Sequence, residues 1–566
     1  MPFNRDTGIY TSRLRSVALP DKPLSIYDFL FEPRQPYTDD PTAFKRSDPT
    51  GRTWLLDAHS SRSLTYEQAR ERTDELARAF NQRGLTEGTT LVVFAPNDVD
   101  YGPSLWAAFR QGAVASCANP AYQPAELAHQ LKTVDAHHPV KIVLVHPDSV
   151  ETAVKACEEV DFSTEMIVLL RPPGKAVDRD LVNTKSLSSG FPTLDDIIAA
   201  SRDKPLPPKV SIRAEEAKTK LALLSFSSGT TGPPKAVMIP HYAVIANVYH
   251  IYGLIVILHG SLFQNVPIVV LPRFDFRAFL QSIQDFRIST LFLVPPQIIL
   301  LVKQDIVKEY DLSSVKMAMA GAAPLTNDTV TAFRKRFPSI SIGQGYGMTE
   351  SATIISLLDP SVVFPGASAG LLVPNIEAKI VSEGKHMPPG KIGELWSRGP
   401  SNALGYLGNE KATKETFDAD GFLHTGDEAY LDEEGLLFIT DRLKELIKVS
   451  GFQVAPAELE GHLLGHEDVQ DVCVIGIPDE KRGEAPKAYI SLTPAAASRI
   501  KSNGPEAEQA LLSSVKDFVA QHKIKYKHLA EVEIIEAIPK TPSGKLLRKD
   551  LRVRHAQKNK KGGEKL

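Results

Sequence analysis

The sequence predicts an α/β fold divided between two domains. The chain has 566 residues, too many for a single hydrophobic core. Short apolar runs alternate with helical stretches along its first part, which favours α/β layers around largely parallel sheets. After Asp441 the pattern changes to a shorter α+β segment. We therefore expect a large domain over residues 1–440 and a small one over 441–566.

The elements of the large domain can be placed in order. A helix should begin at Thr65, which forms a capping-box pattern with Gln68, and should end at Gly84. The stretch 171–217 is rich in Pro, Ser and charge, so it should be a surface excursion. Further strands are expected over 91–94, 141–145 and 166–170, and further helices near 103–113 and 125–134.

The small domain has fewer elements. Strands are expected over 469–477 and 532–538, with a helix near 506–520 between them. The basic run from Arg554 to Lys561 predicts a solvated, disordered tail.

Composition limits the function classes. A net charge of −3 gives no hint of a nucleic-acid partner. The three cysteines, Cys117, Cys157 and Cys473, lie far apart and have no metal-ligand spacing, which fits structural thiols in a reducing compartment. We expect no secretory signal and no membrane span. The final Glu564-Lys565-Leu566 resembles the peroxisomal Ser-Lys-Leu signal imperfectly, so the expected location is cytoplasmic or peroxisomal; the oligomeric state stays open.

A phosphate-binding loop is predicted between Ser225 and Lys235. It follows an apolar strand-like run, and Gly229 and Gly232 let backbone N–H groups approach an anion. Its lysine does not directly follow a glycine, so the loop is not a Walker motif. Short hydroxyl donors complete it: Ser227, Ser228, Thr230 and Thr231.

Four more segments follow in order: GYGMTE at 345–350, GFLHTGD at 421–427, DRLKELIKVSGFQ at 441–453 and PKTPSGK at 539–545. Together with the loop, they resemble the adenylate-forming superfamily of acyl-CoA synthetases, and most closely its 4-coumarate:CoA ligase and luciferase branch. The resemblance implies a large N-terminal domain of layered sheets with a small barrel-like subdomain, followed by a small mobile α+β domain.

The resemblance also implies a reaction and its cofactors. ATP and Mg²⁺ would convert a carboxylic acid to an acyl-AMP, and coenzyme A would then take the acyl group. Lys545 would be the catalytic lysine, Lys235 a phosphate contact, Thr349 an α-phosphate contact and Glu350 the Mg²⁺ ligand. Further nucleotide contacts implied are Ser227 to Gly232, Gln344, Gly345, Tyr346, Asp427, Arg442 and Gln453.

The other substrates have implied sites too. Asp441 matches the family's hinge, about which the small domain would turn between the two half-reactions. The acyl pocket would contain no cation for a second carboxylate, so a monocarboxylic acid is favoured: aryl, aryl-propenoic or medium-chain. Its residues would be His250, Tyr252, Gly321, Ala322, Ala323, Gly347 and Met348, and those for coenzyme A would be Arg273, Lys444, Lys448, Ser450 and Gly451.

One departure from the family bears on activity. Lys235 and His250 are only 15 positions apart, and an acidic, strand-forming segment that the relatives carry between His241 and His250 is absent. We expect unpaired backbone groups beside the phosphate loop and weak or no activity. Three hypotheses result: an active acyl-CoA ligase, a non-catalytic descendant, or an adenylating enzyme of another branch, luciferase-like or directed to a carrier protein. The last form is disfavoured because no carrier domain follows Lys545.

Overall fold

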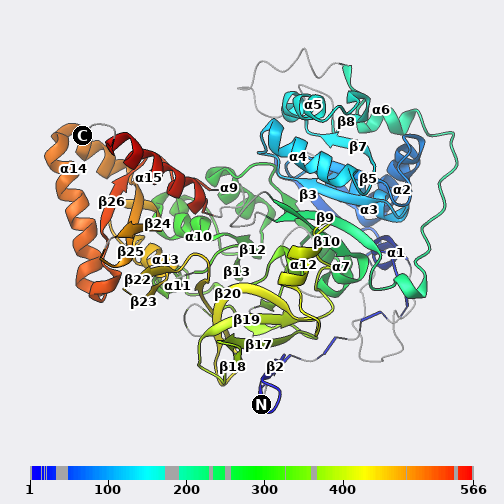
Figure 1. The fold of residues 1–566 in the computed structure, drawn as a ribbon. Coiled ribbons are helices and arrows are strands. Elements are labelled where there is room, and N and C mark those ends of the chain that lie inside the picture. Colours follow the sequence, from blue (N-terminus) through cyan, green and yellow to red (C-terminus); the bar gives the residue numbers. More distant parts are fainter. Residues whose placement is uncertain are drawn as a thin grey trace.

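The protein is described here from a computed structural model, which covers residues 3–563 except 15, 18, 21, 33–48, 61, 172–189, 228–233, 249–256, 326, 358–365, 367, 451, 480 and 541–545. Figure 1 shows a large part with several sheets and, beside it, a smaller C-terminal part.

The first layer is a six-stranded sheet with the order β10-β9-β6-β5-β7-β8. Side chains of β5 alternate between its faces: Val93 packs with the helices α2 and α3, and Val92 packs with α4 and α5. The strands are β5 (Thr90–Phe94), β6 (Val114–Ala118), β7 (Val140–Val145), β8 (Ile167–Leu169), β9 (Leu221–Ser227) and β10 (Lys235–Pro240). The helices are α1 (Ile26–Phe31), α2 (Tyr66–Gln82), α3 (Tyr101–Arg110), α4 (Pro124–Asp135), α5 (Val150–Glu159), α6 (Leu194–Ala199) and α7 (His241–Val248).

A second layer contains two three-stranded sheets, β11-β3-β4 and β12-β13-β14. Leu271, just after β11, packs against the core that contains Leu291 and Leu293 of β12. The strands are β3 (Thr53–Asp57), β4 (Ser63–Thr65), β11 (Ile268–Val270), β12 (Thr290–Leu293), β13 (Met317–Ala320) and β14 (Ser341–Gln344). The helices are α8 (His259–Gln264), α9 (Phe276–Phe286), α10 (Pro295–Lys303) and α11 (Asn327–Arg336).

A seven-stranded antiparallel sheet completes the large part, in the order β1-β2-β17-β19-β20-β21 with β18 paired to β17. Its strands are β1 (Phe3–Asn4), β2 (Ile9–Thr11), β17 (Glu377–Ser382), β18 (Lys385–His386), β19 (Gly393–Arg398), β20 (Leu423–Leu431) and β21 (Leu437–Arg442). The short strands β15 (Ser356–Leu357) and β16 (Leu371–Leu372) pair with each other, and the helix α12 spans Glu410–Thr416.

The C-terminal part has its own five-stranded sheet, β23-β22-β25-β24, with β26 paired to β25. Its strands are β22 (Ile447–Val449), β23 (Phe452–Val454), β24 (Val469–Asp479), β25 (Gly483–Leu492) and β26 (Glu531–Ile534). The helices α13 (Pro456–Leu463), α14 (Pro494–His522) and α15 (Arg548–Gly563) pack around it.

Most expected elements are confirmed, and one is wrong. Thr65 caps α2 through a capping box with Gln68, as predicted. The basic run 554–561 is not a disordered tail, because it lies within α15. Arg554 and Lys558 form ion pairs with Glu533, a partner 21 or more residues away that the run itself does not reveal.

Two further expectations concern composition. All three cysteines are free thiols, and Cys157 and Cys473 are buried. Among the helices of the described residues, none is both long enough and apolar enough to cross a membrane.

Candidate functional site

The candidate nucleotide site lies where β14, β20 and β21 bring three motifs together. Tyr346 follows β14, and its hydroxyl donates a hydrogen bond of 2.6 Å to the Asp427 carboxylate on β20. Arg442 of β21, paired in register with Asp427, contacts the same carboxylate at 3.1 Å. Burial opposes the charge of Arg442, but neighbouring carboxylates, Asp427 first, outweigh it and raise the pKa of Arg442. Three predicted contacts thus form one cluster.

The turn after Tyr346 carries Thr349 and Glu350. It contains the short 3₁₀ helix η7 (Thr349–Ser351), and the next residue, Ala352, has a left-handed φ of 47°. A Cβ atom at Gly347 would lie 1.7 Å from the Thr353 carbonyl oxygen, so only glycine fits there. The GYGMTE motif therefore specifies a compact, strained turn.

Glu350 is buried, and two groups from a distant segment hold it. The Tyr406 hydroxyl donates to Glu350 Oε1 at 2.8 Å, and the Ala403 N–H donates to the Glu350 carbonyl at 2.8 Å. The Lys235 ammonium lies 4.6 Å from the centre of the Tyr406 ring. Tyr406 thus connects Lys235, the predicted phosphate contact, with Glu350, the predicted metal ligand. Sequence reasoning missed it because no motif covers its position.

The residues present fit a magnesium ion bound together with ATP. No group of three or more His, Cys, Asp or Glu within the described ranges could hold a metal alone. Mg²⁺ commonly binds through one or two carboxylates plus substrate phosphates, and it prefers hard oxygen ligands. Tyr406 occupies one oxygen of Glu350, and no described residue donates a hydrogen bond to the other. This other Glu350 oxygen suits a metal site that the triphosphate of ATP would complete.

The turns after β13 and β14 lie together and would form part of the acyl pocket wall. Gly345 donates its N–H to the Ala320 carbonyl, and Gly321 donates to the Leu293 carbonyl. The Gln344 side chain accepts from the Leu325 N–H at 2.9 Å, which holds the 321–325 turn beside the end of β14. Ala322 has a φ of 70°, so its small side chain stands on strained backbone. Two predicted wall residues, His250 and Tyr252, are outside the described residues, as are Ser228 to Gly232 of the phosphate loop.

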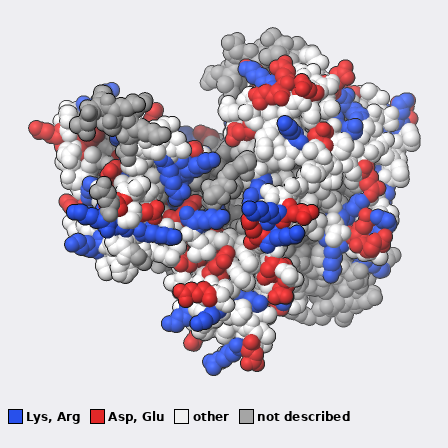
Figure 2. Space-filling model, viewed as in Figure 1, with Lys and Arg blue, Asp and Glu red and all other residues white. Residues whose placement is uncertain are grey.

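Three of the predicted coenzyme A residues, Lys444, Lys448 and Ser450, lie on the β22–β23 hairpin or just before it. Lys444, Lys448 and Ser450 are exposed, and Lys448 pairs in register with Gln453. Figure 2 shows basic side chains gathered where the C-terminal part meets the larger part. Arg273, which is also predicted to contact coenzyme A, follows β11 in the larger part and forms an ion pair with Asp148 at 3.2 Å. Gly451 and Lys545 are outside the described residues.

Asp441, the predicted hinge, is buried at the end of β21. The backbone N–H groups of Arg442 and Ala457 donate to its carboxylate at 2.7 and 3.2 Å. Burial dominates these hydrogen bonds and raises the pKa of Asp441 to about 7.

The raised pKa of Asp441 predicts how stability depends on pH. Unfolding returns the group to its ordinary pKa, so between about pH 4 and 7 the folded state holds a proton that the unfolded state releases. The stability contributed by neutral Asp441 is therefore present below pH 4 and lost as the pH rises through about 7. Asp441→Asn cannot ionise and should remove this slope. Denaturant unfolding at pH 5 and pH 8 should show a stability difference, variant minus wild type, that grows with pH; a constant difference would contradict the raised pKa.

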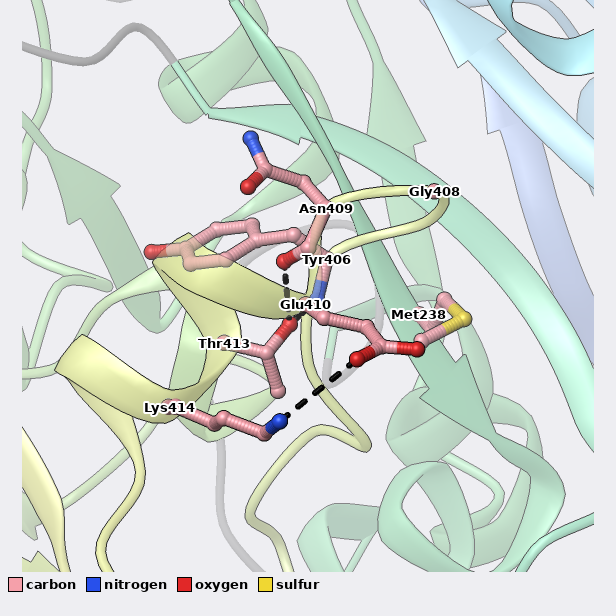
Figure 3. Close-up of a pocket in the computed structure, with 7 residues that line it drawn as sticks. All are labelled: Met238, Tyr406, Gly408, Asn409, Glu410, Thr413 and Lys414. Atoms are coloured by element: carbon pink, nitrogen blue, oxygen red, sulfur yellow. Dashed lines mark hydrogen bonds and ion pairs between the residues drawn. The ribbon is translucent and has the colours of Figure 1, made fainter.

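A cavity of about 300 Å³ lies beside Tyr406, between β10 and α12 (Figure 3). The Thr413 hydroxyl oxygen accepts from the Tyr406 N–H at 3.0 Å, and the close-up shows Lys414 directed toward Glu410. The remaining lining residues are Met238, Gly408 and Asn409. The cavity adjoins Lys235 and Glu350 through Tyr406, but its described lining includes none of Gly321, Ala322, Ala323, Gly347 and Met348 of the predicted acyl pocket.

The strand that follows the phosphate loop, β10, has hydrogen-bonded neighbours on both sides. β10 pairs with β9 on one side, and on the other side it exchanges hydrogen bonds with residues 404–407. The Met238 N–H donates to the Gly405 carbonyl, and the Leu407 N–H donates to the Ala236 carbonyl. β10 is therefore hydrogen-bonded along both edges at residues 236–238. Residues 228–233 and 249–256 are outside the described residues, so unpaired groups beside the phosphate loop itself stay a prediction.

Comparison with known proteins identifies the family. The family described as "AMP-binding enzyme" matches residues 43–407, and "AMP-binding enzyme C-terminal domain" matches residues 458–545. 4-Coumarate–CoA ligase 1 of Solanum tuberosum is 32% identical over 593 residues, covering 98% of this chain and 99% of the relative. Probable CoA ligase CCL5 of Humulus lupulus is 34% identical, covering 88% and 90%.

A solved structure shares the fold over almost the whole chain. The anthranilate CoA ligase AuaEII, solved with anthranoyl-AMP, superposes with a TM-score of 0.76 at 22% identity, covering 94% of this chain and 97% of that one. The layered α/β fold expected from the sequence is thereby confirmed. The chain therefore belongs to the AMP-binding enzyme family and is a homologue of the adenylate-forming 4-coumarate–CoA ligases.

Proposed function

We propose that this protein is an AMP-forming acyl-CoA ligase for a monocarboxylic acid, with ATP, Mg²⁺ and coenzyme A as cofactor and co-substrates. The observation that carries the proposal is the contact chain from Lys235 through Tyr406 to Glu350, beside the Tyr346–Asp427–Arg442 cluster. It brings together groups suited to phosphate, metal and ribose.

The chemistry proceeds in two steps. A carboxylate oxygen of the acid attacks the α-phosphorus of ATP, and the bond to pyrophosphate breaks. The sulfur of coenzyme A then attacks the acyl carbonyl, the thiol loses its proton, and AMP leaves. Lys235 and Lys545 would offset the repulsion between the two anions in the first step, and bound Mg²⁺ would neutralise phosphate charge. Asp427 would accept hydrogen bonds from the ribose hydroxyls.

Domain motion would let one site serve both steps. Asp441 is the second-to-last residue of β21, the last strand of the seven-stranded sheet, and the next strand, β22, already belongs to the C-terminal sheet. We place the hinge and the boundary between 1–440 and 441–566 there. A turn about Asp441 would exchange Lys545 for the face with Lys444, Lys448, Ser450 and Gly451.

Pyrophosphate exchange over a panel of aryl, aryl-propenoic and medium-chain acids tests this proposal. Asp427→Asn should raise the KM for ATP about 10-fold or more, since a charge-assisted hydrogen bond contributes about 1.5–3 kcal/mol. Asp468→Asn is the matched control, because Asp468 is also buried against an arginine, Arg499 at 2.6 Å, away from the predicted site residues. Equal ATP dependence in the two variants would contradict the ribose role of Asp427.

A further inference from the structure

The two residues after Glu350, Ser351 and Ala352, are held from a second side, by α7. Asn247 of α7 is 1% exposed. Its side-chain amide nitrogen donates to the Ala352 carbonyl at 2.7 Å and to the Ser351 carbonyl at 3.3 Å. Both acceptor residues are buried, so water cannot replace these bonds. The Asn247 Oδ1 atom, also buried, has no hydrogen-bond partner among the described residues. The contacts of the Asn247 side chain with described residues are therefore made by its N–H donors and not by its carbonyl oxygen.

The turn that Asn247 contacts has a strained backbone. Ala352 and Thr353 both have positive φ values, 47° and 118°, which are unfavourable for residues with a Cβ atom. Within the turn, the N–H groups of Ser351 and Thr353 both donate to the Met348 carbonyl, so the backbone is tightly closed. Strained backbone persists only where surrounding contacts determine it. The Asn247 amide supplies two such contacts, directly after Glu350.

We infer that Asn247 is a positioning residue for Thr349 and Glu350, an inference that rests on the proposed function for its catalytic meaning. The continuous segment 235–248 would then carry Lys235 and also hold the turn that contains Glu350. β10 begins with Lys235, and α7, which follows β10 without a gap, carries Asn247. Tyr406 and Ala403 hold Glu350 from the other side. Losing the amide donors should let the turn relax and move the proposed metal ligand.

The first test measures hydrogen exchange in the turn itself and needs no ligand. Asn247→Leu keeps the shape of the side chain and removes its donors, whereas Asn247→Ser keeps one hydroxyl donor if the larger change prevents folding. Hydrogen exchange of peptides covering residues 346–357 should accelerate about tenfold or more in Asn247→Leu and less in Asn247→Ser. The control is Gln130→Met, since Gln130 is another buried amide with one donated bond, to Ser116, and a carbonyl oxygen without a described partner. Wild-type exchange rates in both Asn247 variants would overturn the inference.

The second test measures the affinity for a metal ion bound together with ATP. Electron paramagnetic resonance should show that Asn247→Leu binds Mn²⁺ with ATP about 10- to 100-fold more weakly than wild type, the range for losing a partner that orients a metal ligand. Gln130→Met should bind like wild type. Unchanged Mn²⁺ affinity in Asn247→Leu would overturn the positioning role. If wild type exchanges no pyrophosphate with any acid, the proposed function fails, but hydrogen exchange still decides whether Asn247 holds the turn.

Discussion

Replacing Lys545 by alanine should lower acyl-AMP formation about 100- to 1,000-fold, the usual cost of removing a group that stabilises transition-state charge. Thioester formation from supplied acyl-AMP should stay close to wild type. The substitution should affect the two half-reactions differently because Lys545 would leave the site when the C-terminal part turns about Asp441. Single-turnover assays of each half-reaction measure the effect.

A nearby lysine provides the control for Lys545. Lys549 is exposed on α15, four positions further along, and Lys549→Ala should leave both half-reactions unchanged. Arg548, between the two, forms ion pairs with Glu445 and Glu460 and ties the start of α15 to the rest of the C-terminal part. It should therefore not be used as a control. Equal losses in both half-reactions for Lys545→Ala would contradict the two-state scheme.

Inserting the relatives' missing segment after Tyr249 should raise ligase activity at least about tenfold, which corresponds to about 1.4 kcal/mol of transition-state stabilisation. The alignment with the potato ligase extends over 593 residues, more than the 566 of this chain, so that relative contains residues that this chain lacks. Pyrophosphate exchange would compare the two proteins. A flexible Gly/Ser insertion of equal length is the control, because it restores length without a strand.

The structure indicates which kinetic constant should change on insertion. β10 is hydrogen-bonded on both edges at residues 236–238, and Tyr406 contacts both Lys235 and Glu350. The described residues of the predicted ATP site are therefore already in contact. His250 and Tyr252, which would line the acyl pocket, follow the insertion point directly. We therefore expect a lower KM for the acid and an unchanged KM for ATP. Equal, robust turnover without the insertion would show that the shortened segment is tolerated.

The sequence predicted the elements whose signals are local. The capping box of Thr65 and Gln68 lies within four residues, and the apolar runs of the first sheet are continuous, so the helix α2 and the strand β5 were placed correctly. The predicted nucleotide residues Tyr346, Asp427 and Arg442 come from separate motifs, and their contacts in the structure agree with a shared site.

What could not be predicted depends on partners far away in the chain. Tyr406 bonds Glu350 across 56 positions, and Asn247 bonds Ala352 across 105, so neither is recognisable from its own neighbours. The run at 554–561 was misjudged for the same reason. Its charge favours a solvated tail, but Glu533 on β26 provides the pairing that keeps Arg554 and Lys558 on the folded surface.

Product analysis tests most directly whether this chain is an acyl-CoA ligase. The chain as given, and the chain with the segment restored, would be incubated with ATP, Mg²⁺, coenzyme A and each acid of the panel, and the products would be identified by mass spectrometry. We expect acyl-CoA and AMP in equal amounts from a monocarboxylic acid, with more of both products after the segment is restored. AMP or pyrophosphate exchange without a thioester would place the chain in another branch of the family, and no adenylate in either protein would make it a non-catalytic descendant.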